Sequence, residues 1–318
     1  MTRIGVVGAG RVGAVLSAAL RAAGHEIAAA AGESTASRDR IDALLPGVRR
    51  TKPTDVARSC DLLLLTVPDD MLENVVTTMV GAGAIRSGQV VCHTSGRHGL
   101  AVLDVATSIG ARPLALHPAM TFTGTAVDLD RLPGCVFGVT APDDERALAE
   151  SLVADMGGVA MFVPENKRTL YHAGLAHGAN HLVTLVTQAM ELLAASGAED
   201  PAATLRPLLS AALDNALVSG DAALTGPIVR GDVNTVAAHL TEIAENAPAT
   251  IPSYVAMAKA TADRAVLDGR LLPIRAVKIV RLLDEALARV DFDAVGAREP
   301  RPDARMHEQV RRNRTDRP

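Results

Sequence analysis

Residues 171–186 read YHAGLAHGANHLVTLV and place His172, His177, Asn180 and His181 among small and apolar residues. A buried polar side chain costs free energy unless it finds a partner, so a helix that only fills a core has no use for them. An imidazole titrates near neutral pH and suits general acid catalysis. We therefore expect this stretch to form one wall of an active site, with His172 as the proton donor.

The same stretch has the period of an amphipathic helix, which we expect to run without a break over residues 168–195. At about 100° per residue, its polar side chains fall on one stripe opposite leucine and valine, with His172 at the edge of that stripe. The stripe consists of Asn180, Thr184, Thr187 and Glu191. Asn180 is predicted to orient the substrate.

A second candidate site is the segment GAGRVG, which begins at Gly8 and fits the G-x-G-x-x-G pattern of dinucleotide-binding turns. The pattern is weak alone, but here it follows a strand-like run and opens a helix. Gly8 permits the tight turn, Gly10 lets the backbone approach a pyrophosphate, and Gly13 allows close packing of helix on strand. Arg11 and Val12 lie at the helix N-terminus, whose free N–H groups can bind phosphate.

The end of the second expected strand selects the nucleotide, and there the chain reads GESTASRDR. Ser34, Thr35, Ser37 and Arg38 have the character of a cradle for the 2′-phosphate of NADP. Glu33 fits the ribose 2′-hydroxyl of NAD instead, and a flavin dinucleotide also accepts the glycine motif. We expect NADP, with NAD as the alternative.

Loops at the ends of three apolar runs complete the expected site. Val67 and Pro68 follow the third run and are expected to line the cofactor. Thr94 and Ser95, in HTSG, offer hydroxyls to the cofactor and to a carboxylate or carbonyl oxygen of the substrate. His117, in HPAM, is expected to fix the backbone beside the nicotinamide. Open α/β sheets bind ligands at this carboxyl edge.

Charged residues in two other loops could either bind a ligand or stabilise their own loop or the helix that follows it. Arg230, in LTGPIVRGD, can hold a substrate carboxylate through two hydrogen bonds, or it can pair with Asp232 and fix the loop. Asp232 is expected to cap the helix that follows. Asp69 and Asp70 either lie beside the cofactor or cap the helix after the third strand.

The composition is that of an ordinary globular protein of two domains, with 318 residues, 48% hydrophobic residues and a formal net charge of −4. This balance argues against nucleic-acid binding, and no apolar run reaches the roughly 20 residues that span a bilayer. The chain enters a strand-like run at once, so no signal peptide is expected and we predict a cytoplasmic protein. Cys60, Cys92 and Cys135 are expected to be buried thiols, and the histidines show no metal-ligand spacing, so no metal is expected.

Short strand-like runs alternate with helical stretches up to about residue 164, and helical periods alone follow. This order predicts the α/β class, with a doubly wound, mostly parallel Rossmann sheet followed by a second, all-helical domain. We place the NAD(P)-binding domain at residues 1–164 and the helical substrate and dimerisation domain at 165–292. The charged stretch at 293–318 is predicted to be disordered.

Together the motifs resemble those of a bacterial Rossmann-like family with a helical C-terminal domain of unknown function. GVVGAGRVG, HTSG, HPAMTFTG, YHAGLAHGANHL and LTGPIVRGD carry the resemblance, which extends from residue 3 to about residue 290. The wider group includes ketopantoate reductase, pyrroline-5-carboxylate reductase and β-hydroxyacid dehydrogenases of the 6-phosphogluconate dehydrogenase type. The resemblance implies an NADP-linked reductase that forms a homodimer through its helical domain.

The chain departs from ketopantoate reductases at the catalytic lysine that begins their helical domain. Alignment on Asn180 puts His172 at the position of that lysine and Ala176 at that of the first asparagine. We therefore expect NADPH-dependent reduction of a small 2-keto acid, ketopantoate first, with His172 as the acid. Ser95 and Arg230 are expected to hold the substrate carboxylate. Reduction of an imine such as pyrroline-5-carboxylate and a non-catalytic NADP sensor are the alternatives.

Overall fold

The computed structural model describes residues 1–290, and the tail predicted at 293–318 lies outside the described residues. Contacts divide the chain into two compact units, one of Met1–Asn180 and one that begins at His181. The sequence pattern places the domain boundary earlier, after residue 164. The difference arises because the helix that begins at Arg168 is anchored to the sheet by that buried side chain.

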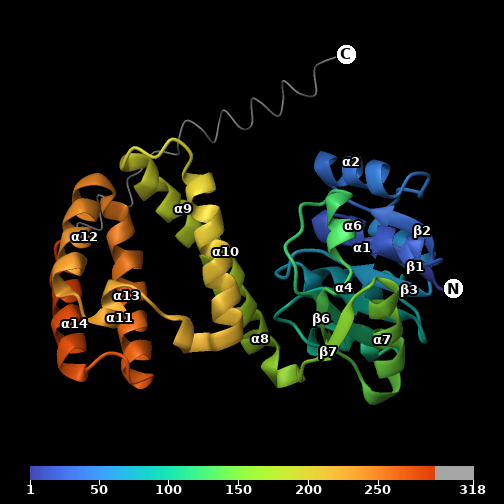
Figure 1. Cartoon of the computed structure of the whole chain (residues 1–318). Helices are drawn as coiled ribbons and strands as arrows, with labels where there is room; N and C mark the ends of the chain where they lie inside the picture. The colour runs from blue at the N-terminus through green and yellow to red at the C-terminus, as the bar shows by residue number, and fades with distance from the viewer. Residues whose placement is uncertain (291–318) are drawn as a thin grey trace, which may run out of the picture. The chain divides into compact units, whose positions relative to one another are not determined.

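The first unit is built on a seven-stranded sheet in the order β2-β1-β3-β4-β5-β6-β7 (Figure 1). Neighbouring strands pair in parallel from β2 to β5, β6 runs antiparallel to β5, and β7 is parallel to β6. This is the predicted doubly wound, mostly parallel sheet, and it brings the carboxyl ends of the first five strands to one edge. The strands are β1 (Arg3–Val7), β2 (Glu26–Ala31), β3 (Leu62–Leu65), β4 (Val90–His93), β5 (Arg112–Pro118), β6 (Val136–Thr140) and β7 (Val159–Phe162).

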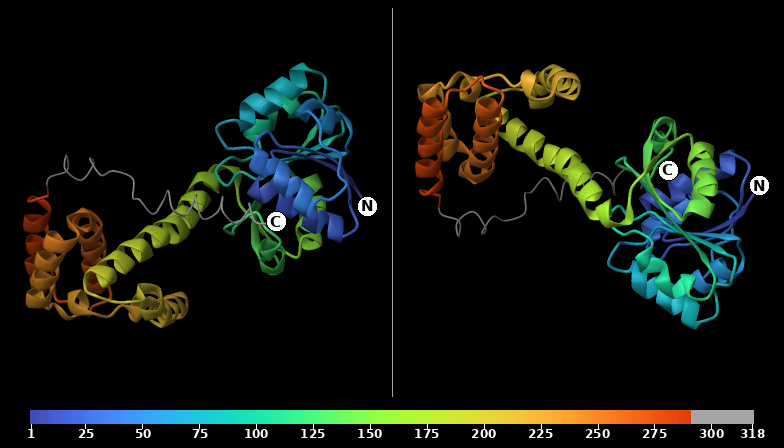
Figure 2. Two further views of the ribbon diagram at one scale, coloured as in Figure 1. Left: turned by 90° about the horizontal axis from the view of Figure 1, so that it is seen from above. Right: turned by 90° about the horizontal axis from the view of Figure 1, so that it is seen from below.

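Helices cover both faces of this sheet (Figure 2). Along β3, Leu62 and Leu64 pack into the core on one face, and Leu63 and Leu65 pack into the core on the other. A strand buried on both faces has no polar side to show, which is why this run is apolar throughout. One face carries α1 (Arg11–Ala22), α2 (Thr35–Leu44), α6 (Val127–Arg131) and α7 (Arg146–Asp155), and the other α3 (Pro53–Arg58), α4 (Leu72–Gly81) and α5 (Asp104–Thr107).

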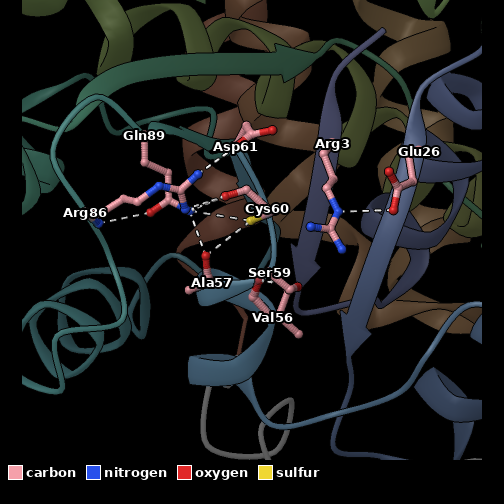
Figure 3. A network of polar contacts seen from close by, with 9 residues as sticks. All are labelled: Arg3, Glu26, Val56, Ala57, Ser59, Cys60, Asp61, Arg86 and Gln89. Atoms are coloured by element: carbon pink, nitrogen blue, oxygen red, sulfur yellow. Dashed lines mark hydrogen bonds and ion pairs between the residues drawn. The ribbon is translucent and has the colours of Figure 1, made fainter.

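A hydrogen-bonded network closes the amino edge of the sheet, opposite the expected site (Figure 3). The buried side chain of Gln89 donates to the carbonyls of Ala57 at 2.7 Å and Cys60 at 3.0 Å. Burial raises the pKa of the Cys60 thiol to about 11, so this side chain is an apolar group at neutral pH. Cys92 is buried as well, whereas Cys135 is only half-buried beside the start of β6, so the prediction of a buried thiol is wrong there.

The second unit is helical and is described separately from the first. Its core lies among α12, α13 and α14, where Val236, Val255 and Ile279 are buried. Asp232 caps α12 as predicted, because its carboxylate accepts the Thr235 N–H at 3.1 Å. No helix within residues 1–290 is both long enough and apolar enough to cross a membrane. The helices are α9 (His181–Ala195), α10 (Pro201–Ser219), α11 (Pro227–Arg230), α12 (Val233–Asn246), α13 (Ile251–Leu267) and α14 (Pro273–Leu287).

The helix predicted without a break over 168–195 is interrupted. It consists of α8 (Arg168–Leu175), a π-helical turn (Ala176–Asn180) and then α9. Gly178 lies inside the turn, where glycine weakens the α-helical hydrogen-bond pattern. A π turn holds more residues than an α turn, so a constant rotation of about 100° per residue does not hold through it. The predicted stripe is therefore interrupted between Asn180 and Thr184, whereas Thr184, Thr187 and Glu191 still share one face of α9.

Candidate functional site

A cleft of about 1210 Å³ opens at the carboxyl edge of the sheet. It gathers the glycine turn, the end of β2 and the loops after β3 and β4 around one space. The predicted residues in its wall are Gly8, Gly10, Val12, Ser34, Ser37, Arg38, Val67, Pro68, Thr94 and Ser95. Residues that the sequence did not single out also line it, among them Arg50, Thr51, Lys52, Asp55, Thr66 and Met71.

The glycine turn has the geometry that a dinucleotide needs. Gly8 has a φ of +87°, and a Cβ there would lie 2.7 Å from the backbone nitrogen of Val67. A Cβ on Gly13 would overlap the hydroxyl of Thr66, so glycine lets α1 pack against the end of β3. Helix α1 has no side-chain cap and no acidic residue in its first turn. Its first backbone N–H groups are therefore available to a phosphate.

Arg11 lies outside the wall of the cleft, at the loop that leaves β5. A Cβ on Gly124 would lie 2.9 Å from Arg11 Cγ and 2.6 Å from Arg40 Nε, so this loop crosses closely over the start of α1. The buried carboxylate of Asp128 holds the loop, because it accepts the Gly124 N–H at 2.7 Å and the Thr123 hydroxyl at 2.9 Å. Arg11 thus contacts a loop in this structure, and its predicted contact with the cofactor stays a prediction.

The end of β2 supplies hydroxyls and a cation to the cleft. Ser34 caps α2 by accepting the Ser37 N–H at 3.1 Å, and the two hydroxyls are 2.9 Å apart. One of the two hydroxyl hydrogens lies in this bond and the other can be donated to a ligand, and Arg38 is exposed beside them. Glu33 lines the same end of the cleft, so the geometry accommodates either nucleotide that the sequence suggested.

Two further cations reach this end of the cleft from a segment whose position the sequence did not predict. Residues 49–51 extend along β2, where the Thr51 N–H donates to the Ala30 carbonyl at 3.1 Å. The pairing brings Arg50 and Lys52 into the wall of the cleft. Arg50 is paired with Asp42 at 3.0 Å, whereas Lys52 forms no ion pair with a residue in the described part of the chain. Lys52 is therefore the better candidate for a phosphate ligand.

The loops after β3 and β4 are joined by an ion pair. Asp69 lines the cleft, and its carboxylate lies 3.5 Å from Arg97 Nε. Helix α4 begins after Met71 without a side-chain cap, so neither Asp69 nor Asp70 caps it. Of the two predicted alternatives for Asp69, the place beside the cleft is the one that the structure shows.

His93 shapes the turn that carries the cleft residues. Its Nε2 donates to the Gly99 carbonyl at 2.8 Å, and its Nδ1 accepts the Ser95 N–H at 3.1 Å. Burial lowers the pKa of His93 to about 4, and the charge of Arg168 adds to the effect. The ring is therefore neutral, with both nitrogens in use, and its role is to fix the turn.

The buried His93 predicts a loss of stability in acid. Its pKa is 6.5 in the unfolded chain and about 4 in the folded one, so the unfolded state binds more protons between these pH values. The free energy of unfolding should therefore fall as the pH decreases from 6.5 toward 4, by about 3 kcal/mol in full. Urea denaturation between pH 7 and pH 5 measures this in the wild type and in His93→Gln, which keeps an N–H near Nε2. Equal pH dependence in the two proteins would contradict the assignment.

Gly96 connects the cleft to a pair of histidines within the first unit. A Cβ on Gly96 would overlap His172 Cδ2 and would lie 3.0 Å from His117 Nε2. The two imidazole rings are 5.8 Å apart and nearly perpendicular, at 86°. His172 from α8 and His117 from β5 therefore meet beside the loop whose neighbours, Thr94 and Ser95, line the cleft.

His117 belongs to this pair and not to the wall of the cleft. Its Nδ1 lies 2.9 Å from the hydroxyl of Tyr171, which follows Arg168 by one turn of α8. Burial lowers the pKa of His117 to about 4, and the charges of Arg168 and His172 act in the same direction. The structure places His117 next to His172, and its predicted place beside the nicotinamide stays a prediction.

Arg168 is a buried cation that the sequence did not reveal. Its guanidinium donates to the carbonyls of Ser95 and Gly138, the latter at 2.9 Å. Its Nε has no hydrogen-bond partner, and the guanidinium forms no ion pair with residues 1–290. The guanidinium charge of Arg168 therefore lies at the Ser95 carbonyl and has no carboxylate partner. Such a charge favours the binding of an anion nearby. The only sequence signal was its position at the start of the polar helix.

The remaining predicted residues lie elsewhere. Asn180 is exposed at the end of the π turn, and Arg230 is exposed on α11 in the second unit. Part of the predicted polar stripe, namely Thr184, Thr187 and Glu191, lines a hollow of about 310 Å³ against Ala249 and Thr250 within the second unit. Within residues 1–290, no three His, Cys, Asp or Glu side chains form a group that could hold a metal ion.

Comparisons with known proteins agree with this architecture. Residues 1–118 match the family model of a Rossmann-like domain, and residues 135–261 match that of a domain of unknown function, DUF2520. The chain therefore combines a Rossmann-like domain with a DUF2520 domain, as the resemblance in its motifs implied. No curated protein matches the chain significantly.

Solved structures with low sequence identity share the fold. A Bacteroides fragilis protein assigned as an NADP oxidoreductase is 19% identical with a TM-score of 0.69, over 82% of this chain and 98% of its own. A Thermotoga maritima protein is 19% identical with a TM-score of 0.60, over 83% and 99%. The Plasmodium falciparum pyrroline carboxylate reductase with NADP bound is 11% identical with a TM-score of 0.54, over 88% and 98%.

Proposed function

We propose that the protein is an NADPH-dependent reductase that acts on the carbonyl of a small substrate bearing a carboxylate. The loop at residues 94–96 carries the proposal, because Thr94 and Ser95 line the dinucleotide cleft while Gly96 lies against His117 and His172. One loop thus joins a nucleotide site to a pair of imidazoles. Proteins of the same fold include one assigned as an NADP oxidoreductase and a pyrroline carboxylate reductase with NADP bound, which supports the proposal.

The cleft fits the cofactor in its details. The free N–H groups at the start of α1 would hold the diphosphate. Ser34, Ser37, Arg38 and Lys52 would hold the 2′-phosphate, and Val67 and Pro68 would line the adenosine side. NADPH, when bound, supplies a hydride.

The proposed reduction requires one hydride at the carbonyl carbon and one proton at the oxygen, as the π bond between them breaks. His172 gives the proton to the oxygen and recovers one from water. The Ser95 hydroxyl accepts the His98 N–H at 3.1 Å and keeps its own hydrogen for the substrate carboxylate. The buried charge of Arg168 favours an anionic substrate at this loop. Asn180 as the orienting residue and Arg230 as a carboxylate ligand stay predictions from the sequence.

The substrate class is tested by turnover. We propose ketopantoate first, and an imine such as pyrroline-5-carboxylate as the second candidate. NADPH oxidation is followed by absorbance with a panel of 2-keto acids and cyclic imines. Turnover of keto acids is the expected result, and turnover of imines alone would support the second candidate. Tight NADPH binding without turnover of any compound would contradict both and favour a sensor.

We also propose that the protein is a homodimer. In α10 only Leu205 is buried, while Leu213 and Leu217 are 51% and 79% exposed on one face of the helix. Light scattering should give twice the chain mass of 33.0 kDa. Leu213→Glu with Leu217→Glu should shift the protein toward the monomer, whereas Leu267→Glu, on α13, is the matched control. A wild type that is monomeric at every concentration would contradict the proposal.

A further inference from the structure

We propose that His117 is a second catalytic residue, which donates a hydrogen bond from Nε2 to the substrate oxygen that His172 protonates. The inference rests on the proposed reductase function and deepens it. His172 supplies the proton, and His117 stabilises the negative charge that develops on the oxygen before the proton arrives. A donor placed where charge develops is a large contributor to catalysis.

The position of Nε2 is the first argument. Nε2 lies 3.0 Å from the position that a Cβ on Gly96 would take, and His172 Cδ2 lies closer still to the same position. Nε2 makes no hydrogen bond to any residue of the described chain, although the other nitrogen of the ring does. His117 Nε2, which has no partner in the described chain, therefore lies near Gly96, where the loop after β4 contacts His172.

The contact with the Tyr171 hydroxyl determines which nitrogen of the His117 ring carries the hydrogen. Burial raises the pKa of Tyr171, so the phenol keeps its proton at neutral pH. The phenol hydroxyl has two possible acceptors on His117, namely Nδ1 at 2.9 Å and the backbone carbonyl at 3.5 Å. The shorter contact is the stronger hydrogen bond, so the phenol hydrogen goes to His117 Nδ1. Because a neutral imidazole carries one N–H, that hydrogen is on Nε2.

The charges around His117 keep it neutral. Burial is the largest cause of its lowered pKa, and Arg168 and His172, both on α8, act in the same direction. Asp69, in the loop after β3, opposes them. With a pKa of about 4, His117 is a hydrogen-bond donor across the neutral range and not a supplier of protons. A neutral imidazole in the role of electrophile is a known catalytic pattern.

The competing explanation is that the pair only ties β5 to α8, and the second unit offers a matched control for it. There His239 Nδ1 lies 2.9 Å from the hydroxyl of Tyr254, with ring centroids 6.2 Å apart. The corresponding values for His117 and Tyr171 are 2.9 Å and 5.6 Å. A purely structural role predicts that phenylalanine in place of either tyrosine has the same effect on turnover.

The test combines a spectroscopic and a kinetic measurement on the full chain. Nitrogen-15 chemical shifts of the histidine rings should show His117 with its hydrogen on Nε2 in the wild type and a mixture of tautomers in Tyr171→Phe. With the substrate that turns over, His117→Leu should lower kcat by about 10²–10³-fold, the usual range for one such donor. His117→Gln, which keeps an N–H near Nε2, should recover most of this loss. Tyr171→Phe should lower kcat by a smaller factor, and Tyr254→Phe should leave it unchanged.

The outcomes separate the inference from the function on which it rests. A hydrogen on Nδ1 in the wild type overturns the inference, whatever the turnover. Normal kcat in a folded His117→Leu protein, or equal losses in His117→Leu and His117→Gln, overturns the inference while the reductase function stands. A wild type that reduces no compound in the panel overturns the proposed function and the inference with it.

Discussion

Replacement of His172 by alanine should lower kcat by about 10²–10⁴-fold, the usual range for a general acid. His172 lies at Gly96, next to the residues at which the loop after β4 enters the cleft, so it is placed to reach the substrate oxygen. NADPH affinity should barely change, because the residues proposed to bind its phosphates lie at the start of α1 and at the end of β2. The loss should therefore be confined to the chemical step.

The measurement compares kcat and the dissociation constant for NADPH in the wild type, His172→Ala and His177→Ala. His177 is exposed in the π turn that follows α8, so its variant controls for the removal of an imidazole from the same segment. His177→Ala should leave kcat unchanged. A His172→Ala enzyme with near-normal kcat would show that the proton comes from water or from another group.

The architecture was predictable because it depends on local sequence patterns. A strand that is buried on both faces must be apolar throughout, as LLLL in β3 is, and this pattern is readable without tertiary information. The glycine turn was predictable for a similar reason. Gly8 has a positive φ, which favours glycine, and a Cβ on Gly13 would overlap Thr66, so only glycine fits at that contact.

The histidine pair was only half predictable. His172 stands out as a polar residue in an apolar helix, whereas the partnership of His117 with Tyr171 joins residues that are 54 positions apart. The burial of Arg168 has no local sign either, because its three hydrogen-bond acceptors come from the loop after β4 and from β6. Contacts of this kind depend on the sheet order, which periodicity does not give.

The π turn shows a different limit. A prediction of which side chains share a helix face assumes a constant rotation per residue, and one wider turn changes the phase of everything after it. Asn180 and the threonines beyond it were grouped with His172 on that assumption. In the structure, Thr184 and Thr187 line a hollow in the second unit, so their polarity has a local explanation.

Removal of the cationic side chains at the end of β2 should convert a preference for NADPH into indifference between the two nucleotides. Arg38 lines the cleft beside two serine hydroxyls, and Lys52 lines it from the segment that pairs with β2. A charge-assisted hydrogen bond contributes about 1.5–3 kcal/mol, which corresponds to roughly 10–100-fold in affinity. Arg38→Ala should therefore weaken NADPH by about that factor, and the double variant with Lys52→Ala should weaken it further.

The size of the effect on NADH decides the interpretation. NADH lacks the 2′-phosphate, so its dissociation constant should change little in either variant, and calorimetric titration with both nucleotides measures the difference. Arg49→Ala is the matched control, because this exposed arginine adjoins the same segment but does not line the cleft. Equal losses for the two nucleotides would show that the cations act on the fold or on the diphosphate. Equal affinities in the wild type, with a selective loss of NADH in Glu33→Ala, would instead identify Glu33 as the ribose ligand of an NAD enzyme.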